Sequence, residues 1–220
     1  MNGNEALAKV AQLARDMAVG YTAHITASRI APRIDSNALV KLIGAYPTDS
    51  VPRKYGPPFT FHTQDTFGDA VVRDTIREEF PKIWLTGSLL AVGDALKDND
   101  YFNDHAPKLE LVYHLRNGVA HGNRFEFNDR GRKRLAKYPA HNHDCYTHGI
   151  FEITPALDGT PVLFNFMEAG DVLDLFFDVA DHLDELKRRA LPQPVVVTEA
   201  ERLRLIELRE KSREQPPESS

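Results

Sequence analysis

The chain has 220 residues, of which 42% are hydrophobic and 27% charged, and its formal net charge is −5. This length and composition exclude a disordered or fibrous chain and are typical of a folded protein with one domain or two small ones. The uncharged apolar stretch from Ile83 to Gly93 has 11 residues, whereas a membrane-spanning helix needs about 20. No basic and apolar signal sequence opens the chain, and we therefore expect no membrane partner.

The chain has a single cysteine, Cys145. An internal disulfide is therefore excluded, and a reducing, cytoplasmic location is favoured. The net charge excludes a uniformly basic nucleic-acid coat, but it leaves room for a local basic patch.

The first 62 residues precede the region with the clearest helical patterns. Residues 4–19 are expected to form a helix, because apolar residues recur there at helical spacing. Prolines and glycines punctuate the remainder, and only residues 36–45 have the pattern of a short helix. We predict an N-terminal helix plus a Pro-rich connector over residues 1–62.

Two helices are expected next. The first begins near Thr63, and Pro81 ends or kinks it. The second spans residues 84–97 and has an apolar face. Its two glycines, Gly87 and Gly93, weaken a helix unless something packs closely against them.

A third helix, over residues 108–121, follows a polar loop over residues 98–107. Pro107 suits the first turn of this helix, since its missing N–H needs no partner there. Gly122 stands where a left-handed residue commonly ends a helix.

The next segment, residues 123–149, is polar, basic and histidine-rich, and we expect a loop. Two strand-like runs follow, residues 149–154 and 161–167. They flank Asp158-Gly159, a strong turn signal, so a β-hairpin is predicted.

A long helix is expected over residues 171–188, and its aspartates form one acidic, solvated face: Asp171, Asp174, Asp178, Asp181 and Asp184. A linker, a charged helix and a disordered tail are expected over residues 191–220. The predicted fold is mainly α-helical, with a helical domain over residues 63–190 and a short β-hairpin inserted before its last long core helix.

Arg116 falls within the apolar face of the helix over residues 108–121. An arginine cannot lose its charge, so burying it requires a partner. One interpretation is an ion pair with a carboxylate, for which the candidates are Glu78, Asp94 and Asp174. The others are a backbone carbonyl cluster, a subunit interface or an anionic ligand.

A polar stripe runs along the same helix through Glu110, His114, Asn117 and His121. His121 lies in the last turn, where the helix dipole stabilises a protonated imidazole. It is either a proton-transfer group or a C-terminal cap. Gly118, in mid-helix, either admits another backbone or a ligand, or is simply tolerated.

The sequence from Arg116 to His121, RNGVAH, resembles the R-x(4–6)-H motif of the HEPN superfamily (higher eukaryotes and prokaryotes nucleotide-binding). The polar Asn117 directly after the arginine is also typical of that family. The flanking sequence HLRNGVAHGNRFEF is similar to a bacterial and plasmid-borne HEPN subfamily, and the resemblance covers roughly residues 63–189.

The resemblance implies a helical bundle that forms a homodimer and cleaves RNA without a metal or other cofactor. Arg116 would then stabilise the phosphoryl charge, and His121 would be the general acid or base. Asn117 would orient His121 or hold a phosphate. Such proteins act in toxin, defence or RNA-processing systems, so an antitoxin or other regulatory protein is an expected partner.

Some HEPN proteins do not cleave RNA. The alternative implied by the resemblance is therefore a noncatalytic nucleotide-binding or assembly module. In that case Arg116 and His121 would be structural or would hold a nucleotide without turnover.

Basic residues directly follow the motif, and five of them are candidates for nucleic-acid binding: Arg124, Arg130, Arg132, Lys133 and Arg134. They could track a phosphate backbone. The alternative is a solvated flexible loop.

Four zinc-capable residues form a further cluster: His141, His143, Cys145 and His148. Their H-x-H-x-C-x2-H spacing is too compressed for the usual paired-ligand sites, so we assign no metal. A small metal-binding regulator built on this cluster is the third functional hypothesis.

Overall fold

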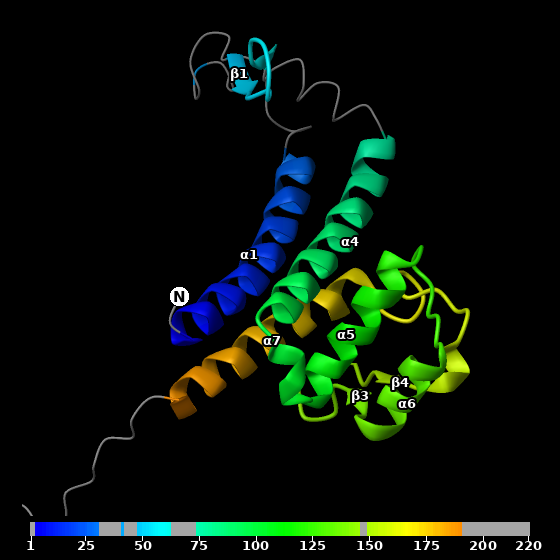
Figure 1. Ribbon diagram of the computed structural model, residues 1–220. Coiled ribbons are helices and arrows are strands. Elements are labelled where there is room, and N and C mark those ends of the chain that lie inside the picture. Colours follow the sequence, from blue (N-terminus) through cyan, green and yellow to red (C-terminus); the bar gives the residue numbers. More distant parts are fainter. Residues whose placement is uncertain (1–2, 31–40, 42–47, 63–73, 146–148, 191–220) are drawn as a thin grey trace, which may run out of the picture. The chain divides into compact units, whose positions relative to one another are not determined.

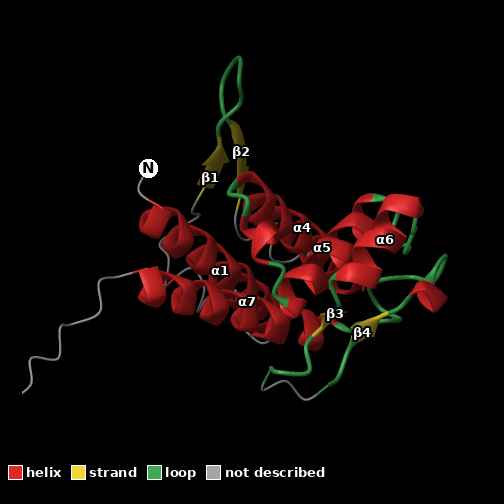
Figure 2. Cartoon of the chain, turned by 60° about the horizontal axis from the view of Figure 1, so that its bottom comes forward, coloured by secondary structure: helices red, strands yellow, loops and turns green. Residues whose placement is uncertain are grey.

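The computed structural model describes residues 3–30, 41, 48–62, 74–145 and 149–190. The chain divides into two units, Met1–Lys187 and Arg188–Ser220, and every described helix and strand begins in the first. Helices dominate, as predicted (Figures 1 and 2). The described elements are α1 (Gly3–Ile30), β1 (Thr48–Val51), β2 (Phe59–His62), α4 (Asp74–Asp98), η2 (Tyr101–Asp104), α5 (Pro107–Ala120), α6 (Asp129–Lys137), β3 (Ala140–His141), β4 (Glu152–Ile153), η3 (Pro155–Leu157) and α7 (Ala169–Ala190).

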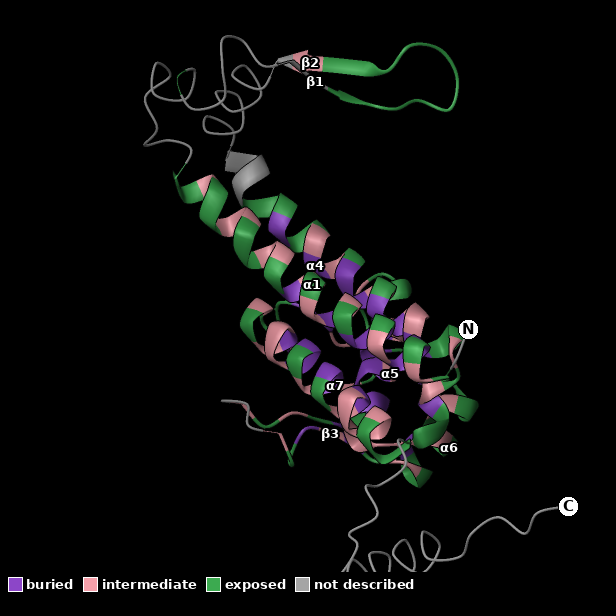
Figure 3. Ribbon diagram, turned by 90° about the vertical axis from the view of Figure 1, so that its left-hand side faces the viewer, coloured by how far each residue is buried: buried purple, intermediate pink, exposed green. Residues whose placement is uncertain are grey.

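The hydrophobic core lies between α1, α4, α5 and α7, as in a helical bundle. Helix α1 packs along α4, and α4 packs against α5 (Figure 1). Buried residues line the facing sides of these helices (Figure 3). The predicted apolar face of α4 is fully buried: Leu85, Leu89, Val92 and Leu96. Each such side chain contributes about 1.5–3 kcal/mol on burial. No helix in the described ranges has the length and apolar character to cross a membrane.

Helix α1 runs well beyond residue 19, where the predicted helix ends. The reason is a close contact with α4 at Gly20. A Cβ placed there would lie 2.6 Å from the Trp84 ring, and the indole Nε1 donates to the Met17 carbonyl at 3.3 Å. The glycine thus admits the indole ring instead of ending the helix.

Of the two alternatives predicted for Pro81, ending the helix is wrong, because α4 runs through it from Asp74 to Asp98, and the two predicted helices are one. A proline removes one backbone hydrogen bond and crowds the preceding turn. The buried apolar face that follows Pro81 stabilises α4 sufficiently to offset this loss. Residues 63–73 lie outside the described residues.

The predicted connector contains a β-hairpin that its sequence does not signal. Strands β1 and β2 pair antiparallel, with Thr48 opposite His62 and Val51 opposite Phe59 (Figure 2). Each has four residues, which is too short for a clear alternating pattern. The helix predicted over residues 36–45 falls outside the described residues, Lys41 excepted.

The predicted loop over residues 123–149 contains helix α6. The Asn128 side chain caps it, since Oδ1 accepts from the Gly131 N–H at 2.9 Å. The predicted candidates Arg130 to Arg134 therefore lie on a helix, and the solvated-loop alternative is wrong for them.

The prediction of a hairpin between residues 149–154 and 161–167 is wrong. Strand β4 pairs antiparallel with β3 and not with residues 161–167. The Asp158-Gly159 turn contacts an earlier loop instead. Asp158 Oδ1 accepts from the Phe127 N–H at 3.0 Å, and the Gly159 N–H donates to the Phe125 carbonyl at 2.7 Å. A small two-stranded sheet does precede α7, but β3 and β4 form it and not the two runs that the sequence predicts.

The acidic face of α7 is not simply solvated, which corrects the prediction. Arg15 of α1 forms ion pairs with Asp181 at 2.9 Å and Asp184 at 2.7 Å. Asp178 is partly buried beside Cys145, and burial raises the pKa of its carboxyl. These aspartates therefore help to join α7 to its neighbours. The linker, last helix and tail predicted over residues 191–220 fall outside the described residues.

Candidate functional site

Helix α5 carries the motif, and it begins and ends within one residue of the bounds that the sequence predicts. Pro107 is its first residue, and the helix ends at Ala120 with His121 as the C-terminal cap. The His121 N–H is bonded to carbonyls of the last turn, and its side chain is exposed. Gly122 follows with φ +85°, which is the expected left-handed conformation.

Gly118 allows the chain to fold back over the end of α5. The Arg124 N–H donates to the Gly118 carbonyl at 3.0 Å. A Cβ at Gly118 would lie 2.5 Å from Val162 Cγ2 and 2.9 Å from the Arg124 carbonyl oxygen. The close approach is therefore of the Val162 side chain and of the backbone at Arg124, and a backbone approach is one of the interpretations that the sequence left open. It brings the segment after the motif back beside Asn117 and His121.

The guanidinium of Arg116 is held from two sides. It forms an ion pair with Asp94 of α4, with its Nε donating at 2.9 Å and its Nη2 to the same oxygen. Its Nη1 donates to Asn117 Oδ1 at 3.2 Å. The carboxylate partner that the sequence left among three candidates is thus Asp94.

Gly93 explains how Arg116 reaches Asp94. A Cβ at Gly93 would lie 2.5 Å from Arg116 Cγ, so the arginine stem lies directly on the α4 backbone. Three of the five guanidinium N–H groups bond to Asp94 and Asn117, and the other two have no hydrogen-bond partner within the described part of the chain.

Arg116, Asn117 and His121 line one cleft of about 450 Å³. Its walls come from the end of α4, η2, α5, the loop before α6 and the first turns of α6. Arg130 and Arg134 of α6 line it as well. This volume falls in the range of small-molecule sites, about 300–1,000 Å³. Five of the eight predicted site residues therefore converge here.

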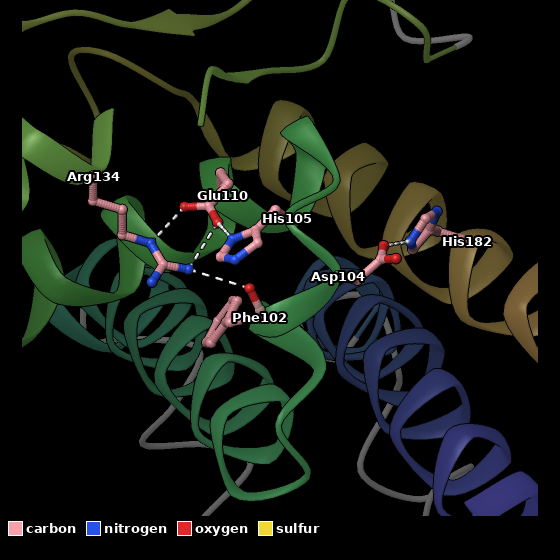
Figure 4. A network of polar contacts seen from close by, with 6 residues as sticks. All are labelled: Phe102, Asp104, His105, Glu110, Arg134 and His182. Atoms are coloured by element: carbon pink, nitrogen blue, oxygen red, sulfur yellow. Dashed lines mark hydrogen bonds and ion pairs between the residues drawn. The ribbon is translucent and has the colours of Figure 1, made fainter. Parts of the chain in front are cut away.

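Arg134 is fixed at the cleft wall by Glu110, which is fully buried in α5 (Figure 4). Its Nε and Nη2 donate to the two carboxylate oxygens at 2.7 Å each. His105 Nδ1 lies 2.7 Å from Glu110 Oε1, so one carboxylate holds two basic groups. This bidentate pair joins α6 to α5 and fixes that wall of the cleft.

The other three basic candidates do not line the cleft. Arg124 donates to the Gly159 carbonyl at 2.7 Å, and Arg132 forms an ion pair with Asp158. Lys133 is exposed on α6. Arg124 and Arg132 thus brace the Asp158-Gly159 turn.

His114 lies on the buried wall of the cleft and is 5% exposed. The pKa of its imidazole is lowered to about 4, chiefly by burial, while nearby Glu110 acts to raise it and Arg134 acts to lower it. The ring is therefore neutral at pH 7. Its Nε2 is buried without a hydrogen-bond partner in the described part of the chain.

The histidine-rich cluster shows no metal site within the described residues. The rings of His141 and His143 stack with centroids 4.0 Å apart, and His141 Nδ1 accepts from the His143 N–H at 3.3 Å. Burial raises the pKa of the Cys145 thiol to about 11, so it is protonated at pH 7. No group of three or more His, Cys, Asp or Glu side chains is placed to hold a metal among the described residues, from which His148 is missing.

Comparison of the chain with protein-family models, curated proteins and solved structures finds no match. The function is therefore argued from the cleft. Sequence reasoning left Lys97, Asn128 and Phe127 out of the site, although all three line the cleft. Asp94 was only one of three candidates, and its one distinguishing signal is the glycine directly before it.

Proposed function

We propose that the chain is a metal-independent ribonuclease of the HEPN type that acts as a homodimer in the cytoplasm. The observation that carries the proposal is the convergence of Arg116, Asn117 and His121 on one cleft with Arg130 and Arg134. Two cationic side chains that line the cleft support it further. Lys97 and Arg130 have no ion-pair partner among the described residues, so both can meet phosphates.

RNA supplies its own nucleophile, the 2′-hydroxyl. A histidine removes the 2′ proton, and the oxygen attacks the adjacent phosphorus. The bond to the 5′-oxygen breaks, and an acid protonates that leaving oxygen. The products are a 2′,3′-cyclic phosphate and a free 5′-hydroxyl. Arg116 stabilises the charge that develops on the phosphoryl oxygens, and Asn117 positions the guanidinium.

The two proton transfers require two groups, and one chain has one motif histidine, His121. His114 lines the same cleft, but with a pKa of about 4 only about one molecule in a thousand carries the acidic proton at pH 7. A two-fold dimer supplies a second His121 at a shared interface. A toxin or defence role would also require a neutralising partner protein.

One observation favours the alternative, a noncatalytic nucleotide-binding or assembly module. The charge of Arg116 is already balanced by Asp94, as expected of a structural arginine. The two functions differ in turnover. A binding module holds a nucleotide or RNA and leaves it intact.

The test is cleavage of single-stranded RNA in excess EDTA by the wild type, Arg116→Ala and Arg29→Ala. Arg29→Ala is the matched control, because it removes an exposed arginine of α1 that does not line the cleft. We expect the wild type and the control to cleave and to leave cyclic-phosphate ends, and folded Arg116→Ala to lose at least about 100-fold in rate. RNA left intact by a folded wild type favours the binding module.

A further inference from the structure

His114 lines the cleft, and one polar atom of its side chain has no role in the proposed reaction. His114 Nε2 is shielded from solvent and has no hydrogen-bond partner among the described residues, although His114 lines the cleft. Leaving a buried polar atom unpaired destabilises a folded protein, so such atoms need an explanation. A ligand that enters the cleft and pairs with Nε2 supplies one.

The surroundings of His114 indicate which ligand this is. Its ring makes edge contacts with the rings of Tyr113 and Phe127, with centroids 5.1 and 5.8 Å away. Two charged groups face it, Glu110 from one turn earlier on α5 and Arg134 from α6, and these are already bonded to each other. A neutral imidazole among aromatic rings suits a flat, uncharged partner with polar edges. It does not suit a phosphate, which would favour a protonated ring.

The distance along α5 from His114 to the motif residues is comparable with the length of one nucleotide. It precedes Asn117 by three residues and His121 by seven, so the three lie along one stripe of α5. Seven residues of helix span about 10 Å. This is comparable with the reach from a phosphate to the far edge of its own base.

We propose that the inner end of the cleft is a nucleobase subsite, in which His114 Nε2 hydrogen-bonds to the edge of a base whose phosphate lies near Arg116 and His121. The ligand is a base joined to a ribose phosphate, either a nucleotide within single-stranded RNA or a free nucleotide. Single-stranded RNA is generally read in this way, by aromatic rings and hydrogen bonds to splayed bases. The phosphate end of this inference rests on the proposed function, whereas the base end rests on His114 alone.

The experiment measures binding separately from cleavage. The probes are four 2′-O-methylated homotetranucleotides, one for each base, which lack the nucleophilic hydroxyl and remain intact. The four free nucleoside 3′-monophosphates form a second arm. We expect the full-length wild type to bind one or two of the tetranucleotides about 3- to 10-fold more tightly than the others, the range of one hydrogen bond. Tighter binding of tetranucleotides than of monophosphates identifies the source as RNA, and the reverse identifies a free nucleotide.

Two variants of His114 assign the preference. His114→Phe keeps a ring between Tyr113 and Phe127 but removes Nε2, and we expect the base preference to fall below about twofold. His114→Gln restores a neutral polar group and retains most of the preference. Since the His114 imidazole stays neutral, the wild-type preference is also expected to be constant from pH 5.5 to 8.

The wild type alone gives a readout that no variant can spoil by misfolding. On addition of the preferred tetranucleotide, the ring ¹⁵N resonance of His114 is expected to shift, as it does when a hydrogen bond forms. Equal binding of all four bases by the wild type would overturn the subsite and would indicate that water satisfies Nε2. A preference that survives in folded His114→Phe would overturn it equally.

The subsite and the nuclease fail separately. Base preference without any cleavage by the wild type would support the subsite and contradict the proposed nuclease activity. Cleavage without a His114-dependent preference would do the opposite. Folded His121→Ala is the internal control, and we expect it to lose cleavage and to keep the base preference.

Discussion

Arg116 depends on one carboxylate for its orientation. We expect Asp94→Asn to lower the rate of RNA cleavage by about 10- to 100-fold, because a guanidinium held less firmly is misplaced relative to the phosphate. Asp94 is half exposed, so the free energy of unfolding should change by no more than about 1 kcal/mol. Single-turnover cleavage rates and urea denaturation measure the two effects.

The matched control is Asp98→Asn, which removes the same charge from the same helix at an exposed position outside the cleft. It should cleave at the wild-type rate. If Asp94→Asn also cleaves at that rate, then Asp94 does not position Arg116 for catalysis.

His114 makes stability depend on pH. Its pKa is about 4 in the folded chain and about 6.5 when unfolded, so between these values the unfolded chain binds one more proton. Stability from this group is therefore lost as the pH falls below about 6.5. We expect the stability advantage of the wild type over His114→Gln, measured by urea denaturation, to shrink by about 2 kcal/mol from pH 7 to 4.5. An advantage that is constant with pH would contradict this.

At this scale the sequence predicts residue types better than their partners. The spacing of Arg116, Asn117 and His121 places them on one helix end, and all three line the cleft. The Asp94 partner depends on how α4 and α5 pack, which no local pattern encodes. The same is true of Arg134, whose partner Glu110 lies 24 residues earlier.

The stem of Arg116 on α5 packs directly against α4 at Gly93, and a methyl group there would collide with it. We expect Gly93→Ala to destabilise the fold by about 1–3 kcal/mol, as overpacking does. It should also lower the cleavage rate, because the collision moves Arg116. Thermal and urea denaturation measure the change.

Gly87 of the same helix gives the opposite expectation. No atom lies within 4 Å of a Cβ built there, so Gly87→Ala should stabilise the fold by about 0.5–1 kcal/mol. Equal effects of the two substitutions would show that helix propensity, and not contact with Arg116, determines the cost at Gly93.

Helices with long apolar faces are predictable, and short elements defined by contacts with other segments are not. Helices α5 and α7 agree with their patterns to within a few residues. Pro81 does not end α4, because tertiary packing outweighs one lost hydrogen bond. The strand β4 pairs with β3 and not with residues 161–167, because the Asp158-Gly159 turn is bonded to the loop before α6.

For the whole molecule, the proposed dimer makes a quantitative prediction. If two copies of His121 act in one site, equal amounts of wild type and His121→Ala, allowed to exchange subunits, should retain about one quarter of the activity of the wild type alone at the same total concentration, because only wild-type pairs are active. If each chain acts alone, about one half remains. Initial cleavage rates across a series of mixing ratios measure this.

The most direct test of the proposed function is cleavage of single-stranded RNA in excess EDTA by the wild type, His121→Ala and His143→Ala, each confirmed to be folded. His143→Ala removes an exposed histidine outside the cleft and is the matched control. We predict cleavage by the wild type and the control, with 2′,3′-cyclic phosphate ends, and none by His121→Ala. Cleavage by folded His121→Ala at the wild-type rate, or none by the folded wild type, would contradict the proposal.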